Sequence, residues 1–151
     1  LNNTGMTPHV RFLGLVDRRD LVALYRLATM TVVPSLHEGY GLPVMEALAS
    51  GSPLTCADIP ALRELLAGHE DAFVFFDPRD PHDMADAMAS TLARCYELTQ
   101  AQARVYSVLS QRTWQTVASE YLEVLQEAIA RSSWQGQIRA EKPLAEVLSH
   151  G

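Results

Sequence analysis

Apolar positions follow two patterns along most of this chain. Short, β-branched apolar runs bounded by Pro, Gly or Asp predict buried strands at residues 9–15, 30–33, 52–57 and 72–76. Apolar residues that recur every three or four positions predict helices at 17–28, 43–50, 59–67 and 81–92, from Thr99 onward, and from Thr113 to about Arg131. Strands that alternate with helices predict an α/β fold with a Rossmann-like, doubly wound parallel sheet.

Local end signals support several of these helices. Asp17 and Asp80 stand where a capping side chain is expected, and Pro81 follows Asp80 at a first helical position. Thr99 and Gln102 have the spacing of a capping box. Residues 1–131 have room for one compact domain, and the Ser/Gln-rich tail at 132–151 is expected to be disordered or locally helical.

The stretch from Pro34 to Gly51 is the centre of the chain. It leaves the carboxyl end of the predicted strand 30–33, where parallel α/β sheets bind their ligands, and enters the helix at Pro43. Gly39 and Gly41 allow the main chain to approach a ligand closely or to take a positive φ. The N–H groups from Gly41 to Val44 lie at a helix start, where a phosphate is favoured.

Two acids lie in this stretch, Glu38 in the loop and Glu46 one turn into the helix. Carboxylates only accept hydrogen bonds, so the pair suits a ligand rich in hydroxyls. In one interpretation, Glu38 binds a sugar and Glu46 binds a ribose, and the main chain between them binds the phosphates. In the other interpretation, Glu46 only interacts favourably with the helix dipole, and Glu38 is a solvated acid of the loop. Residue chemistry alone leaves both open.

Residues 34–53 read Pro-Ser-x-x-Glu-Gly-Tyr-Gly-Leu-Pro-x-x-Glu-Ala-x-Ala-x-Gly-x-Pro. This pattern resembles the signature of the retaining GT-B glycosyltransferases of group 1, which are related to sucrose synthase and bacterial mannosyltransferases. Their Glu-x7-Glu motif falls on Glu38 and Glu46. The similarity extends from about residue 10 to residue 128, through Leu24-Tyr25 before the motif and Asp77-Pro78 after it.

The resemblance implies a role for each residue of the motif. Glu38 would be the catalytic-site residue that holds hydroxyls of the donor sugar, and Glu46 would bind the ribose. Val16 would line the base. Main-chain groups would surround the sugar and phosphate, from Tyr40, Gly41, Leu42 and Pro43. No metal and no separate cofactor are expected, because the ligand is the substrate itself, a GDP- or UDP-linked sugar.

The resemblance also implies the function. The chain would be the donor-binding part of a C-terminal GT-B domain, in a hexosyltransferase that moves mannose or glucose to an acceptor hydroxyl in glycan or polysaccharide synthesis. The N-terminal domain, which would bind the glycan or lipid-linked acceptor, has no counterpart here, and neither do the family's upstream Arg and Lys. Lys142 is the only lysine, and Arg26 and Arg63 show no aim at the motif loop. We therefore expect this part alone to be inactive and to self-associate through its incomplete sheet.

Two other functions remain open at this point: a nucleotide-sugar-binding or interaction module without catalysis, and a structural α/β domain with an accidental motif. The composition narrows the classes of partner. A net charge of −6 without a basic run argues against nucleic acid. No apolar run reaches the roughly 20 residues of a membrane span. Two cysteines in predicted elements, Cys56 and Cys95, are expected to be unpaired, which fits a cytoplasmic location. A location at the inner face of the membrane would depend on parts not present here.

Overall fold

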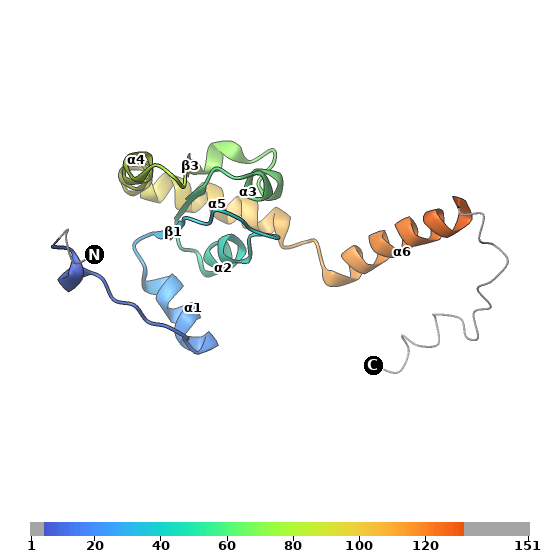
Figure 1. The fold of residues 1–151 in the computed structure, drawn as a ribbon, viewed down its shortest axis with the longest axis horizontal. Helices are drawn as coiled ribbons and strands as arrows, with labels where there is room; N and C mark the ends of the chain where they lie inside the picture. The colour runs from blue at the N-terminus through green and yellow to red at the C-terminus, as the bar shows by residue number, and fades with distance from the viewer. Residues whose placement is uncertain (1–4, 132–151) are drawn as a thin grey trace. The chain divides into compact units, whose positions relative to one another are not determined.

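The structure, a computed structural model, describes residues 5–131, so the predicted tail at 132–151 lies outside the described residues. The chain divides into two compact units, Leu1–Leu109 and Ser110–Gly151. In the first unit, β1 (Thr31–Val33), β2 (Leu54–Ala57) and β3 (Val74–Phe76) form a parallel sheet in the order β1-β2-β3, with helices around it (Figure 1). The predicted α/β, Rossmann-like fold is confirmed.

The central strand, β2, is buried along its whole length. Thr31 is opposite Leu54 on one side, and Val74 is opposite Thr55 on the other. A parallel strand with both faces covered needs a continuous apolar run, and Leu54-Thr55-Cys56-Ala57 supplies it. The one hydroxyl in that run is satisfied, because Thr55 Oγ1 donates to the Val74 carbonyl at 2.6 Å.

Helices cover this sheet and bury its apolar side chains. Of these helices, α2 (Leu42–Ser50) packs against β1 and β2, and α4 (Pro81–Ala93) packs against β2 and β3. The remaining elements of the unit are η1 (Thr7–His9), α1 (Arg18–Leu27), α3 (Pro60–Leu65), η2 (Glu70–Ala72) and α5 (Cys95–Leu109). The predicted caps are confirmed: Asp17 accepts from the Arg19 N–H, and Asp80 from those of His82 and Asp83.

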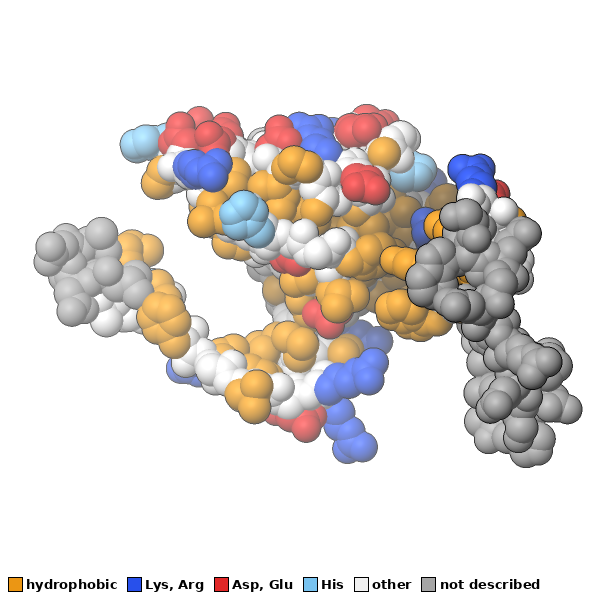
Figure 2. Space-filling view, turned by 45° about the vertical axis from the view of Figure 1, so that its right-hand side comes forward, with side chains coloured by type: hydrophobic (Ala, Val, Ile, Leu, Met, Phe, Trp, Pro, Cys, Tyr) orange, Lys and Arg blue, Asp and Glu red, His pale blue; other side chains and the backbone are white. Residues whose placement is uncertain are grey.

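The predicted strand at 9–15 is wrong. His9 ends the 3-10 helix η1, and residues 10–16 form no strand. Phe12 is 81% exposed and Leu15 is fully exposed, and Figure 2 shows other hydrophobic side chains (orange) at the surface. An apolar pattern makes a segment suitable for a strand, but a strand forms only where a partner offers its hydrogen bonds. Within the described residues, β1 pairs with β2 alone.

The predicted helix start at Thr99 is also wrong. α5 begins at Cys95, and Thr99 Oγ1 donates to the Cys95 carbonyl inside the helix. Gln102 has no capping role because its side chain is buried against the sheet. Its amide oxygen accepts from Leu54 N, and its Nε2 donates to the carbonyls of Leu54 and Ala72, each at 3.0 Å. One side chain therefore ties α5 to β2 and to η2.

Both cysteines are unpaired, as expected. Burial raises the pKa of the Cys56 thiol to about 12, so this side chain is a small apolar part of the core. Within residues 5–131, no helix combines the length and the apolar character of a membrane span.

The second unit contains α6 (Trp114–Arg131). The Thr113 hydroxyl accepts from the Thr116 N–H at 3.2 Å, which explains why the helix begins at the next residue, as predicted within one position. Most of its large apolar side chains are exposed, with Trp114 83% and Tyr121 70% accessible, while Val117 and Leu122 are half-buried. The predicted helix is confirmed.

Candidate functional site

The motif loop, residues 34–41, connects the carboxyl end of β1 to the start of α2. Gly41 is the N-cap of α2, with φ 90° and ψ 40°, and the helix begins at Leu42, one residue before the predicted start. This left-handed conformation disfavours every residue with a Cβ. The glycine therefore fixes the direction in which the loop enters the helix.

Fewer main-chain N–H groups are available at this helix start than the sequence indicates. Val44 N and Met45 N both donate to the Gly41 carbonyl, at 3.0 and 3.2 Å, and Pro43 has no N–H. Among the described residues, the N–H groups of Gly41 and Leu42 donate to no protein acceptor. These two donors, next to the positive end of a helix dipole, can bind an anion.

Gly41 also lies against α3. A Cβ at this position would be 2.7 Å from Leu62 Cδ2 and 3.0 Å from Leu65 Cδ2, and Leu62 is fully buried. A side chain at residue 41 would therefore force the Leu62 side chain to shift within the core. The close approach of α3 thus adds to the conformational requirement for glycine.

We expect Gly41→Ala to lower the free energy of unfolding by about 2–3 kcal/mol, because it adds left-handed strain and overlap with a buried leucine. Gly39→Ala is the matched control, since a Cβ there meets nothing within 4 Å and φ is not positive. Urea unfolding followed by circular dichroism measures both. Equal effects of the two substitutions would contradict this account of Gly41.

Each motif acid has its own hydroxyl partner. Ser35 Oγ donates to Glu38 Oε1 at 2.7 Å, and Glu38 is half-buried. Tyr25 Oη, on α1, donates to Glu46 Oε2 at 3.2 Å, and Glu46 is exposed. No hydrogen bond joins Glu38 to Glu46 in the described part of the chain. In each carboxylate, the second oxygen accepts from no described residue.

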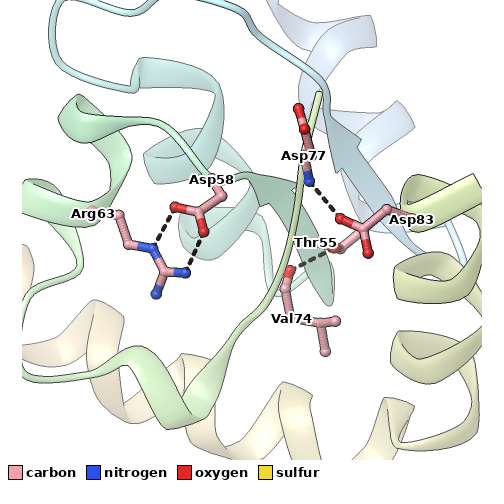
Figure 3. A network of polar contacts seen from close by, with 6 residues as sticks. All are labelled: Thr55, Asp58, Arg63, Val74, Asp77 and Asp83. Carbon is pink, nitrogen blue, oxygen red and sulfur yellow. Dashed lines mark hydrogen bonds and ion pairs between the residues drawn. The ribbon is translucent and has the colours of Figure 1, made fainter. Parts of the chain in front are cut away.

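The carboxyl ends of β2 and β3 also carry acids. Asp58 follows β2 and Asp77 follows β3, and the two line a pocket of about 410 Å³ together with side chains of α3, the 77–80 loop and α4. Asp77 N donates to Asp83 Oδ2 at 2.6 Å (Figure 3). Because the strands are parallel, these residues and the motif loop lie at the same edge of the sheet.

Arg63 lines this pocket together with Arg79, and its position could not be read from the sequence. It binds Asp58 through two hydrogen bonds of 2.7 and 2.6 Å, drawn in Figure 3, and its guanidinium lies 3.8 Å from the centre of the Phe75 ring. The hydrogen bonds from Arg63 lower the pKa of the Asp58 carboxyl. Since Asp58 already neutralises this cation, Arg63 offers little charge to a diphosphate. The only sign of this ion pair in the sequence is the acid Asp58, which stands five residues before Arg63.

A match to the family described as glycosyl transferases group 1 covers residues 1–94. The chain belongs to this family. It is 33% identical to the D-inositol 3-phosphate glycosyltransferase of Corynebacterium glutamicum over 139 residues, which cover 88% of this chain and 32% of that protein. It is 32% identical to the O-antigen chain mannosyltransferase B of Escherichia coli over 111 residues, which cover 74% of this chain and 28% of that protein.

This glycosyltransferase-family chain also resembles a solved structure, the sucrose-phosphate synthase of Thermosynechococcus elongatus. The TM-score is 0.65 at 26% identity, over 86% of this chain and 32% of that one. The chain thus spans about a third of the length of the relatives it matches. The resemblance to GT-B glycosyltransferases of group 1 is confirmed.

The roles given to the individual motif residues stay predictions. Tyr40 and Leu42 are exposed at the helix entry, Gly41 is buried, and Pro43 is partly covered. Val16 is partly covered in the segment that precedes α1, and no recorded hydrogen bond ties it to the motif loop. In the part of the chain that the structure describes, no cluster of His, Cys, Asp and Glu could hold a metal ion.

Proposed function

We propose that this chain is the nucleotide-sugar-binding part of a retaining hexosyltransferase. The donor would be a GDP- or UDP-linked mannose or glucose, and the acceptor a hydroxyl of a growing glycan. The observation that carries this proposal is the motif loop, where the half-buried Glu38 and the two unbonded N–H groups of Gly41 and Leu42 lie at the carboxyl end of β1 in a group 1 family member.

Each group has a role that follows from its chemistry. Glu38 Oε1 is held by Ser35, which leaves Oε2 to accept hydrogen bonds from hydroxyls of the donor sugar. The N–H groups of Gly41 and Leu42, at the helix N-terminus, stabilise negative charge on the departing diphosphate. Glu46 accepts from the ribose hydroxyls. The exposed Tyr40 and Leu42 border the sugar and phosphate through their main chain, and Val16 lines the base.

The proposed reaction breaks the bond between the anomeric carbon and the phosphate oxygen and forms one to the acceptor oxygen on the same face. The acceptor proton passes to the leaving diphosphate. The motif loop supplies orientation and charge stabilisation and needs no protein base for this step. The remaining positive charge and the acceptor site would come from other parts of the complete protein.

The test uses the complete protein with GDP-mannose and UDP-glucose. We expect one donor to bind by calorimetry and to yield a glycoside whose anomeric configuration, determined by nuclear magnetic resonance, matches the donor. Inversion of configuration would contradict the retaining mechanism. Binding without transfer to any glycan acceptor would favour the alternative, a nucleotide-sugar-binding module. Failure to bind either donor would overturn the proposal.

A further inference from the structure

We propose that Tyr25 is a positioning residue for Glu46, whose carboxylate it orients toward the ribose hydroxyls of the donor nucleotide. The inference rests on the proposed function. Its basis is the hydrogen bond from Tyr25 Oη to Glu46 Oε2, which joins α1 to α2 across 21 residues of sequence. Tyr25 touches no proposed ligand group and acts only through Glu46.

The two ends of this hydrogen bond differ in mobility. The Tyr25 ring packs against the buried core of the first unit, so the hydroxyl has a fixed place. Glu46 is an exposed side chain with three rotatable bonds, and in isolation it would sample many rotamers. A fixed donor that binds one carboxylate oxygen removes much of this freedom before the ligand arrives. Such pre-organisation increases affinity without a new contact.

The hydrogen bond also decides which oxygen remains for the ligand. Because Oε2 is bonded to Tyr25, Oε1 is left with both of its lone pairs, which suits a pair of neighbouring hydroxyls. Burial, followed by the charge and hydrogen bond of Glu46, raises the pKa of Tyr25, so its hydroxyl stays protonated and remains a donor at neutral pH. The carboxylate has no described partner other than Tyr25.

The test measures the preference for ribose in the complete protein. Calorimetry gives the affinity for GDP or UDP, whichever binds, and for its 2′,3′-dideoxy analogue, and the ratio of the two affinities is the readout. We expect Tyr25→Phe to lower this ratio three- to tenfold, about the net worth of one ordinary hydrogen bond, with little effect on the dideoxy analogue. In a Glu46→Gln background, Tyr25→Phe should change the ratio less than twofold.

Tyr106→Phe is the matched control. It removes the hydroxyl of another half-buried tyrosine that packs against the same core, and it should leave the ratio unchanged. A ratio unchanged by Tyr25→Phe but lowered by Glu46→Gln would overturn the inference and leave the proposed function standing. An equal loss of affinity for both nucleotides would also overturn it, as a structural effect. If Glu46→Gln leaves the ratio unchanged, or if neither diphosphate binds, the proposed function is wrong, and the inference that rests on it is wrong as well.

Discussion

Glu38→Gln in the complete protein is expected to lower kcat/KM for sugar transfer by about 100-fold or more. Glutamine keeps the size of the side chain but removes its charge, and hydrogen bonds to a charged acceptor are worth about 1.5–3 kcal/mol each. Two donor-sugar hydroxyls on Oε2 would therefore account for the loss. Because Glu38 is only half-buried and Ser35 is its one side-chain partner among residues 5–131, stability should change little. Initial rates with saturating acceptor measure the effect.

Glu64→Gln is the control for this experiment. Glu64 is an exposed acid on α3 whose side chain has no hydrogen bond or ion pair among the described residues, so its loss of charge should leave the rate unchanged. Circular dichroism of both variants shows whether folding is intact. Near wild-type turnover of Glu38→Gln would remove Glu38 from the proposed site, whatever the family motif implies.

The parts of the fold that depend on local sequence could be predicted. The predicted ends of β1, β2 and β3 lie within two residues of the observed ends, because each strand is an apolar run with clear boundaries. Asp17 and Asp80 indicate the starts of the helices that they cap. The motif loop was placed at the carboxyl end of a strand because Met30-Thr31-Val32-Val33 precedes it and Pro43 follows it. These signals lie within a few residues of the elements that they specify.

The contacts that could not be predicted join residues far apart in the chain. Periodicity does not say which strand edge is free to pair, so it misplaced a strand at 9–15. Spacing alone made Gln102 resemble a capping residue, although it binds β2, 48 residues away. The hydrogen bond from Tyr25 to Glu46 spans 21 residues, and the local sequence around neither residue indicates it.

The candidate site shows the same division between local and distant information. The sequence identified Glu38, Gly41 and Glu46 by their spacing, and the φ of 90° at Gly41 agrees with the reason given for a glycine there. It did not reveal that Val44 N, one of the expected N–H donors, is already bonded to the Gly41 carbonyl. Nor did it reveal that Arg63 reaches the carboxyl edge of the sheet, because its ion pair depends on how α3 folds back after Asp58.

Gln102→Leu is expected to lower the free energy of unfolding by about 3–5 kcal/mol. Leucine fills a similar volume, so the effect comes from polar groups and not from a cavity. Gln102 is almost fully buried and makes three hydrogen bonds, to Leu54 N, Leu54 O and Ala72 O. Each main-chain group left unpaired costs about 1–3 kcal/mol.

Gln100→Leu, at an exposed position of the same helix, controls for helix propensity and should change stability by less than about 0.5 kcal/mol. Urea unfolding followed by circular dichroism compares the two, and a loss below about 1 kcal/mol for Gln102→Leu would mean that α5 is held to the sheet by apolar packing alone.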